Sequence, residues 1–310
     1  MMWLTWRQHR LEALGAALLV IPTLVVVAAF FISAQPMLQQ ANSACPTGDS
    51  CSSAVQAFLD RFGTLRVALK AILIGLPVLP GLFVGAPLLA REFEQGTDQL
   101  VWSQGITRRR WLFVKLGLLI AVTLFFATSL AVAGRVWFEA QPAFNSSQWT
   151  EFDIQGPAYV SYAFFSLALG VAAGAAIGRT VPAIAVALVG FVGARMAIEF
   201  LARPNFLAPL QWDVSTSLPG QGDAWTFGDQ RHVDLQGHQI SDAQWQAAIN
   251  PCSQIQGDLG SCLRDHGVVV LQAYQPGDRF WLFQGIEAVI FTVIGIALLG
   301  LAVWLVSRRS

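Results

Sequence analysis

The segment Ala90–Trp111, AREFEQGTDQLVWSQGITRRRW, lies between two long apolar runs. Charged residues stand at both of its ends, and the apolar triplet Leu100-Val101-Trp102 stands near its middle. A hydrocarbon core about 30 Å thick requires roughly 20 apolar residues per helix, so both flanking runs are predicted to span a membrane. Since the segment itself is too polar to span and too short for a domain, we interpret it as a surface element held by two membrane helices.

The rest of the chain has the composition of a membrane protein. Of its 310 residues, 55% are hydrophobic and 12% are charged, whereas soluble domains carry about 25% charged residues. Six apolar runs are long enough to span: Leu11–Ser33, Ala71–Ala90, Leu112–Gly134, Ala158–Gly178, Val181–Ala202 and Phe283–Val306. These runs lack the alternation of membrane β-strands. The predicted fold class is therefore an all-α membrane protein with six transmembrane helices.

The distribution of arginine predicts the orientation, because cytoplasmic loops carry an excess of Lys and Arg. Short segments on one side carry Arg7, Arg10, Arg91, Arg108, Arg109, Arg110, Arg179, Arg308 and Arg309. Basic residues on the other side are spread over long loops, where the rule is weak. Both termini are therefore predicted to be cytoplasmic, with residues 203–282 outside.

Residues 1–10 are predicted to form an interfacial helix. Helical spacing places Trp3 and Trp6 on one face, and likewise Arg7 and Arg10. Tryptophan suits the headgroup boundary, and arginine pairs with phosphates; a plain basic flank that only sets topology is the alternative. The apolar run that follows exceeds the core of a signal peptide, so we expect it to be retained rather than cleaved.

Two helices have unusual small-residue or proline patterns. The run Ala71–Ala90 contains three prolines, which a membrane helix tolerates when neighbours satisfy the freed backbone groups. This helix is expected to lie within the bundle, either lining a pathway or simply kinked for packing. Gly170, Gly174 and Gly178 form a stripe that permits close helix approach, within the chain or at a subunit interface.

Few charges fall inside the predicted spans. Arg195 and Glu199 lie four residues apart in the fifth run, and Glu287 opens the sixth. Intramembrane charges suggest function by default, but a local Arg195–Glu199 pair would neutralise itself, which favours a structural role. Lys115 is expected to reach the cytoplasmic surface along its aliphatic stem.

The stretch from Ala34 to about Leu65 is expected to be an outer loop, and residues 203–282 to be a folded extracellular α/β segment. Ser241 and Gln244 predict a capping box that opens a helix, and Val268–Leu271 is typical of a strand. The four cysteines, Cys45, Cys51, Cys252 and Cys262, all lie in predicted outer loops, which favours disulfides. Close spacing favours Cys45–Cys51 and Cys252–Cys262 among three connectivities, and no metal site is predicted.

Common nucleotide-binding and catalytic motifs are absent from the sequence. Neither lysine follows a glycine, so the chain has no P-loop for ATP. It has no HExxH or GxSxG motif, and a formal net charge of zero gives no case for nucleic-acid binding. We therefore predict that the chain is not an enzyme and holds no cofactor of its own.

Within Ala90–Trp111, the residue types predict a short helix braced by two spans. Gly96 suits a helix C-cap and Thr97 an N-cap, with Asp98 favoured in the first turn by the helix dipole. Leu100, Val101 and Trp102 would give this helix an apolar surface, and Arg108, Arg109 and Arg110 would anchor the next span at phosphates. A solvated loop with topology-setting arginines is the alternative.

The sequence from Ala86 to Trp111 resembles the first cytoplasmic loop of permease subunits of type-2 ABC exporters, especially actinobacterial ones. Trp3–Arg10 resembles their N-terminus, and Tyr274–Gln284 resembles their entry to the last helix. The resemblance implies a permease that dimerises in a bacterial plasma membrane and pairs with separate ATPase subunits, which bind the ATP and magnesium. It implies that Glu94 and the residues from Gly96 to Trp102 form the coupling helix.

The domain organisation predicted is an interfacial helix (1–10), five spans (11–202) with a coupling segment (91–111), an extracellular domain (203–282), and a last span with its tail (283–310). The predicted function is ATP-driven export of a hydrophobic or amphipathic molecule. The alternative is a mechanotransmitting or signalling subunit that an ABC ATPase drives without transport. An apolar cavity at the dimer axis would favour export, and a closed axis would favour the alternative.

Overall fold

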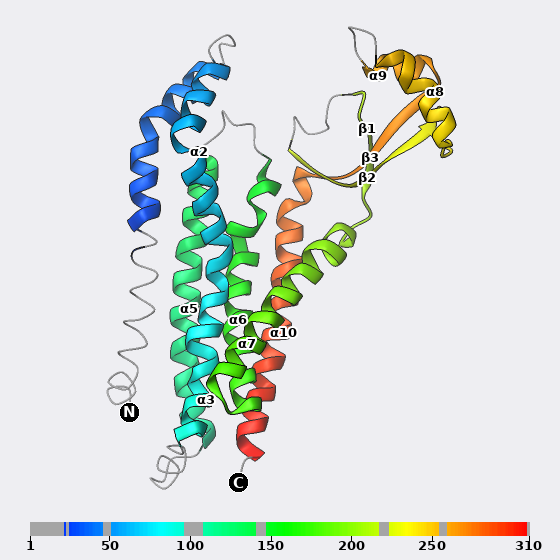
Figure 1. Cartoon of the computed structure of the whole chain (residues 1–310). Helices are drawn as coiled ribbons and strands as arrows, with labels where there is room; N and C mark the ends of the chain where they lie inside the picture. Colours follow the sequence, from blue (N-terminus) through cyan, green and yellow to red (C-terminus); the bar gives the residue numbers. More distant parts are fainter. Residues whose placement is uncertain are drawn as a thin grey trace. The chain divides into compact units, whose positions relative to one another are not determined.

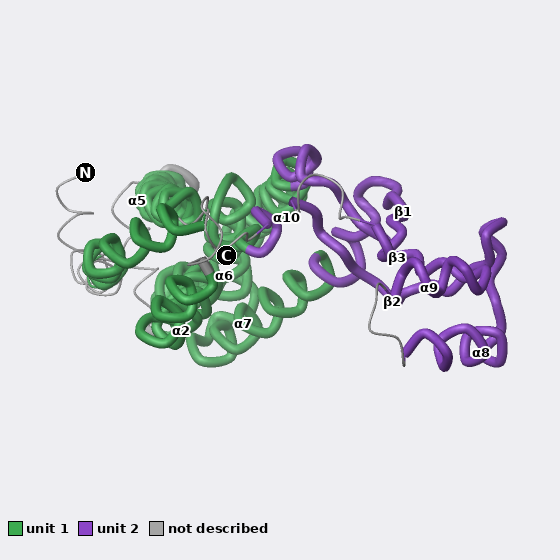
Figure 2. The backbone as a smooth tube through the Cα atoms, turned by 90° about the horizontal axis from the view of Figure 1, so that it is seen from above, with its two compact units in different colours: residues 1–144, 151–198, 284–310 green, residues 145–150, 199–283 purple. Residues whose placement is uncertain are grey.

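The computed structural model describes residues 22, 25–45, 51–95, 108–140, 147–216, 223–253 and 259–308. The chain divides into two compact units, which Figure 2 shows in two colours. Unit 1 comprises Met1–Phe144, Glu151–Ile198 and Gln284–Ser310, and unit 2 comprises Asn145–Thr150 and Glu199–Phe283. The described part of unit 1 is helical, and unit 2 contains a β-sheet.

Figure 1 labels the helices of unit 1 except the one over residues 25–44. The long helices of this unit are a helix over residues 25–44, α2 (Cys51–Gly75), α3 (Ala86–Gln95), α5 (Arg108–Glu139), α6 (Gly156–Ile177), α7 (Thr180–Met196) and α10 (Phe280–Arg308), whose first residues belong to unit 2. A 3-10 turn (Leu76–Val78) and a π-helix (Pro80–Gly85) join α2 to α3. A further 3-10 stretch (Gln148–Ile154) precedes α6, and a π-helix (Ala197–Ala202) follows α7.

Five helical stretches among the described residues are long and apolar enough to cross a membrane. They are Ser52–Glu94, Phe113–Glu139, Gln148–Ile177, Thr180–Asn205 and Gly277–Arg308. These stretches correspond to the last five predicted spans. The first predicted span, Leu11–Ser33, lies mostly outside the described residues and stays a prediction.

The stretch from Ala34 to Leu65, expected as an outer loop, is helical wherever it is described, and its placement outside the membrane stays a prediction. Ser52–Glu94 spans 43 residues, or about 65 Å at 1.5 Å per residue, roughly twice the hydrocarbon thickness. Apolar side chains explain the extra helix: Phe58, Phe62 and Leu69 of α2 form one buried cluster with Phe30 and Leu38 of the preceding helix. Burial of these faces against each other stabilises helix where polarity alone suggested a loop.

Helix α6 is the centre of unit 1. In its most apolar window 78% of residues are buried, against 22–28% in the other four candidate spans. A Cβ added at Gly170 would lie 2.2 Å from the Gly81 carbonyl oxygen, and one at Gly174 would lie 2.5 Å from that of Ala86. These two glycines therefore serve packing within the chain, which is one of the two predicted roles of the stripe. Gly178 ends α6 with a left-handed φ of 67°.

A side chain of α6 satisfies backbone hydrogen-bonding groups in the proline-rich path between α2 and α3. The Ser166 hydroxyl donates to the Val78 carbonyl oxygen at 2.8 Å and accepts from the Gly81 N–H at 3.1 Å. Pro77 and Pro80 lack the N–H groups that would continue an α-helix, so the path passes through 3-10 and π geometry. This arrangement confirms that the proline-rich helix lies inside the bundle.

Unit 2 is built on a three-stranded antiparallel sheet in the order β1-β3-β2. The strands are β1 (Leu210–Asp213), β2 (Ala224–Asp234) and β3 (Val268–Pro276). β3 contains the predicted strand Val268–Leu271, and its register with β2 shifts between Phe227 and Arg231. The sheet confirms an α/β character for residues 203–282.

Two helices cover part of this sheet, α8 (Asp242–Cys252) and α9 (Leu259–Asp265). The predicted capping box is present, since the Ser241 hydroxyl accepts from the Gln244 N–H and the Gln244 side chain accepts from the Ser241 N–H. Ala248, Cys252, Leu263 and Val268 form a buried cluster beneath the two helices. This cluster gives unit 2 a small hydrophobic core of its own.

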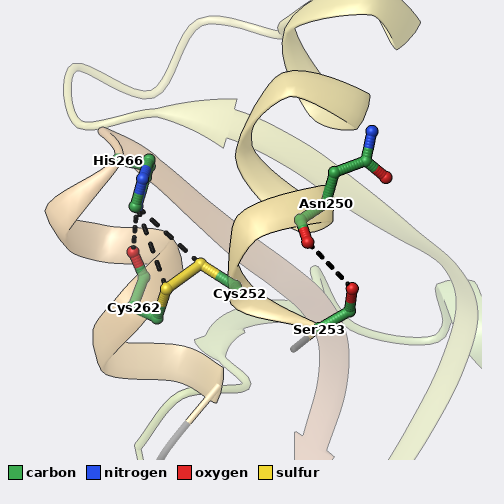
Figure 3. The surroundings of a disulfide bond; sticks show 5 residues. All are labelled: Asn250, Cys252, Ser253, Cys262 and His266. Carbon is green, nitrogen blue, oxygen red and sulfur yellow. Dashed lines mark hydrogen bonds between the residues drawn. A yellow bond between two sulfur atoms is a disulfide. The ribbon is translucent and has the colours of Figure 1, made fainter. Parts of the chain in front are cut away.

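The Cys252–Cys262 disulfide joins α8 to α9 and confirms one predicted pair (Figure 3). His266 Nδ1 lies 2.9 Å from the Cys262 carbonyl oxygen and 3.8 Å from Cys252 Sγ. Two sulfurs and one imidazole would be a metal-ligand set, but these sulfurs are bonded to each other and are not thiolates. Cys45 is disulfide-bonded, while the side chain of Cys51 lies outside the described residues, so that pair stays a prediction.

Candidate functional site

The predicted coupling segment is described only at its two ends. Helix α3 ends at Gln95 and α5 begins at Arg108. The residues between them, including Gly96, Thr97, Asp98, Leu100, Val101 and Trp102, lie outside the described part of the chain, as do Trp3, Trp6, Arg7 and Arg10. Arg108, Arg109 and Arg110 are helical, but their side chains are not described. The geometry that surrounds this segment is therefore given by α3, α5 and the turn before α7.

An ion pair joins the two helices that flank the segment. Lys115 Nζ on α5 lies 2.5 Å from Glu92 Oε1 on α3, and only 6% of the Lys115 side chain is exposed. The expectation that Lys115 reaches the surface is therefore wrong, because a carboxylate of α3 offers a partner at shorter range. The pair is partly buried, since 21% of the Glu92 side chain is exposed, and it holds α3 and α5 in register because removal of one partner would leave the other charge poorly compensated.

A second polar contact joins the end of α3 to the start of α7. The Glu94 carboxylate accepts a hydrogen bond from the Thr180 N–H at 3.0 Å and one from the Thr180 hydroxyl at 2.7 Å. Thr180 is the first residue of α7, so a carboxylate from another helix caps this N-terminus and interacts favourably with the helix dipole. Together with the Lys115–Glu92 pair, this contact ties α3, α5 and α7 together at one end of unit 1.

We call the group formed by Arg195, Asp153, Glu287 and Tyr162 the buried charge cluster. Arg195 donates to Glu287 Oε1 at 3.0 Å and to Asp153 Oδ1 at 2.8 Å. The Tyr162 hydroxyl donates to Glu287 at 2.7 Å, and the Arg195 guanidinium lies 3.7 Å from the centre of the Tyr162 ring. Glu287 is fully buried. The cluster links α6, α7, α10 and the stretch before α6 inside unit 1.

The counter-charges of Arg195 differ from those that the sequence predicted. The prediction placed the counter-charge on Glu199 of the same helical stretch, whereas the structure also supplies carboxylates from two other elements. Glu199 begins the Glu199–Phe283 part of unit 2. Asp153 and Tyr162 carried no signal in the sequence, because their approach to Arg195 depends on how α6 and α7 pack. The structural role of Arg195 stays a prediction, and these contacts give it two carboxylate partners from other elements.

The buried charge cluster is accompanied by a second polar link from α10. Gln284 is fully buried, and its amide donates to the Phe152 carbonyl oxygen at 2.8 Å and accepts from the Ala158 N–H at 3.0 Å. These bonds satisfy backbone groups where the 3-10 stretch turns into α6. Sequence patterns missed this role, since a glutamine at the start of an apolar run resembles any polar flank.

A comparison with protein-family models matches residues 12–203 to the family described as ABC-2 membrane transporter related. The match covers more than half of the chain and includes the predicted coupling segment, α6 and α7. Searches of curated proteins and of solved structures found no match. The chain therefore belongs to the ABC-2 membrane transporter related family, the membrane subunits of ABC transporters that work with ATPase subunits.

Proposed function

We propose that this chain is the permease subunit of an ATP-driven exporter in a bacterial plasma membrane. It works as a homodimer with separate ATPase subunits and moves a hydrophobic or amphipathic substrate outward. The family match supports the ABC assignment. The observation that carries the coupling step is the contact of Glu94 with Thr180, which connects the α3 side of the coupling segment to α7.

In this proposal the residues from Gly96 to Trp102 bind a groove of the ATPase. A force applied there reaches α3 and α5 directly, because both helices flank the segment. The Glu92–Lys115 pair and the Glu94–Thr180 contact then pass the displacement to the other helices as one rigid group. Helix α6 packs against α3, α5 and α7, so such a displacement changes the packing of the whole helical unit.

The test uses proteoliposomes that contain the permease with its ATPase. Trp102→Ala is expected to weaken assembly or to uncouple ATP hydrolysis from transport. Truncation of a Trp that anchors an interface commonly costs about 2 kcal/mol or more of binding free energy. Gly96→Val is expected to act similarly by denying the C-cap a left-handed conformation. Ser103→Ala serves as the control. Unchanged assembly, hydrolysis and transport in both variants would leave the solvated-loop interpretation standing.

The proposed orientation, with both termini in the cytoplasm and residues 203–282 outside, has its own test. A cysteine placed by Ser103→Cys should resist an impermeant thiol reagent in intact cells. One placed by Gln236→Cys, in the turn after β2, should react with it. Labelling at position 103 in intact cells would contradict the proposed topology.

Unit 2 favours a second candidate function, mechanotransmission without transport. It has its own sheet, buried cluster and disulfide, which suits a domain that acts on an external partner. ATP-dependent changes in hydrogen exchange within unit 2, without any vectorial movement of amphiphiles, would support this candidate over export.

A further inference from the structure

Unit 1 contains a cavity of about 420 Å³ between the helix over residues 25–44, α2 and α5. Its wall is mainly apolar and includes Val27, Phe31, Leu69, Leu73, Val132 and Trp137. Pockets that hold small ligands have volumes of about 300–1,000 Å³ and are lined mostly by hydrophobic and aromatic side chains. The cavity therefore has the size and the lining of a ligand site.

Charged side chains line one part of this wall. Arg66 and Lys70 lie one turn apart on α2, and Glu151 lies opposite them. Glu151 Oε1 is 3.2 Å from Lys70 Nζ and 3.9 Å from the Arg66 guanidinium. The Glu151 side chain is 6% exposed, whereas those of Arg66 and Lys70 are 22% and 34% exposed. The charged groups of the lining thus include two cations and one carboxylate.

The charged and apolar parts of the cavity follow one helical stripe. Arg66, Leu69, Lys70 and Leu73 are spaced three or four residues apart, so they share a face of α2. The two cations directly precede the predicted span Ala71–Ala90, so we expect them at the depth where lipid headgroups meet the hydrocarbon. Trp137, whose ring centre lies 4.9 Å from that of Phe30, is a residue type that favours this boundary.

We propose that this cavity binds an amphiphile with an apolar chain and an anionic headgroup. Arg66 and Lys70 bind the headgroup, and the apolar wall covers the start of the chain. The position of the Glu151 carboxylate shows that an anionic oxygen fits within reach of both cations. The proposal deepens the function proposed above and rests on it for the step from binding to export.

Glu151 has a defined part in this site. Glu151 pairs with the cations and reduces the cost of their partial burial. An incoming anionic headgroup competes with Glu151 for the same donors, whereas an uncharged headgroup gains no charge-assisted hydrogen bond. The site therefore prefers an anionic amphiphile over an uncharged one of equal chain length.

The experiment measures binding to the permease chain alone, in nanodiscs of zwitterionic phosphatidylcholine. Brominated palmitate is the probe, its methyl ester is the uncharged comparison, and quenching of tryptophan fluorescence is the readout. We expect the acid to bind more tightly than the ester and Trp137→Phe to remove the largest part of the quenching. The double variant Arg66→Gln/Lys70→Gln should weaken binding of the acid by about tenfold or more, since each charge-assisted bond lost costs roughly that factor.

Two substitutions separate a binding site from an ion pair that only supports the fold. Glu151→Gln should tighten binding of the acid, because the competing carboxylate is gone. Arg61→Gln, which removes an exposed cation of α2 outside the cavity lining, should change nothing. Equal binding of acid and ester, or weaker binding in Glu151→Gln with the helices intact by circular dichroism, would overturn the proposal.

A further arm identifies the source of the amphiphile. Mass spectrometry of protein extracted in native lipid particles should find an anionic lipid that is lost in Arg66→Gln/Lys70→Gln if the occupant is a membrane lipid. If no such lipid is found while palmitate binds, the occupant is a free amphiphile. The fluorescence binding assay needs no ATPase. If palmitate fails to bind while Trp102→Ala still uncouples ATP hydrolysis from transport, only the proposed site is overturned. Normal binding without ATP-driven movement would overturn only export.

Discussion

Both carboxylate oxygens of Glu94 accept hydrogen bonds from Thr180, one from its backbone N–H and one from its hydroxyl. Glu94 lies one residue before the end of α3, and Thr180 opens α7. A single side chain thus caps one helix from the end of another, directly beside the residues proposed to meet the ATPase.

Glu94→Ala should therefore reduce coupling more than stability. Loss of the cap leaves the Thr180 N–H and hydroxyl to water, while the apolar contacts of α3 remain. We expect ATP hydrolysis by the assembled complex to continue with a lower ratio of transport to hydrolysis. Glu94→Gln keeps one acceptor and should be intermediate. An unchanged transport ratio in Glu94→Ala would contradict a role for this cap in coupling.

Removal of Arg195 should be among the most damaging substitutions in unit 1. Arg195→Met leaves the Asp153 and Glu287 carboxylates without their shared guanidinium, which typically costs about 3–5 kcal/mol for a buried pair. The double variant Arg195→Met/Glu287→Gln should lose less stability than the single variant, because the buried charge is also removed. Unfolding in mixtures of detergent and SDS, followed by tryptophan fluorescence, measures both. Additive losses would mean that the two residues do not interact.

Gly170→Ala should destabilise unit 1 by about 1–3 kcal/mol, the range for overpacking a tight core. The added methyl would lie 2.2 Å from the Gly81 carbonyl oxygen, so α6 and the π-helix must separate. Gly117→Ala on α5 is the matched control, because a Cβ there meets nothing within 4 Å. Equal stability of the two variants would contradict a tight contact between α6 and the π-helix at Gly170.

The disulfide of unit 2 should contribute roughly 2–3 kcal/mol, as expected for a short closed loop. Cys252→Ser/Cys262→Ser should increase hydrogen exchange in α8 and α9, which the Cys252–Cys262 bond joins. Exchange in α6 serves as the internal control. Non-reducing peptide mapping of the native chain should find this pair together with Cys45–Cys51; a cross-loop pair would contradict the local pairing.

Acid should loosen the contact between β1 and α9. Burial raises the pKa of Asp213, but hydrogen bonds from the Ser215 hydroxyl and N–H, together with the Arg264 guanidinium, outweigh it and hold the pKa below its ordinary value. The stabilisation is therefore complete above the unfolded pKa of about 3.9 and is lost as pH falls through the lower folded pKa. Hydrogen exchange of the β1 and α9 peptides, corrected for intrinsic rates, should rise in that window. Asp213→Asn should abolish the pH dependence, and Asp229→Asn should preserve it.

Much of the helical architecture was predictable because long apolar runs have few alternatives in a membrane. Five of the six predicted spans correspond to helical stretches of the required length, and the capping box at Ser241 appeared as expected. These features depend on local composition and spacing. The helical character of the stretch from Ala34 to Leu65 was missed, since its stability comes from contact between two faces that lie about 30 residues apart.

The partners of the charged side chains required the tertiary structure. Glu92, Glu94 and Arg195 are conspicuous in the sequence, but Lys115, Thr180, Asp153 and Glu287 come from other elements. A short-range pattern such as Arg195–Glu199 suggests the nearest partner along the helix. Which carboxylate lies close in space depends on the rotation of α6, α7 and α10 about their axes, which apolar runs do not encode.

The sequence by itself determined that this chain is a helical membrane protein, where five of its spans lie, and that it carries no P-loop motif. These properties follow from hydrophobicity, helix length and missing motifs, which are local quantities. Only the tertiary structure decided that α6 is the buried centre, that Ser166 satisfies the proline-rich path, and that Arg66, Lys70 and Glu151 meet at an apolar cavity. Each of these depends on which faces of distant helices touch, because packing and partial burial arise from all elements together.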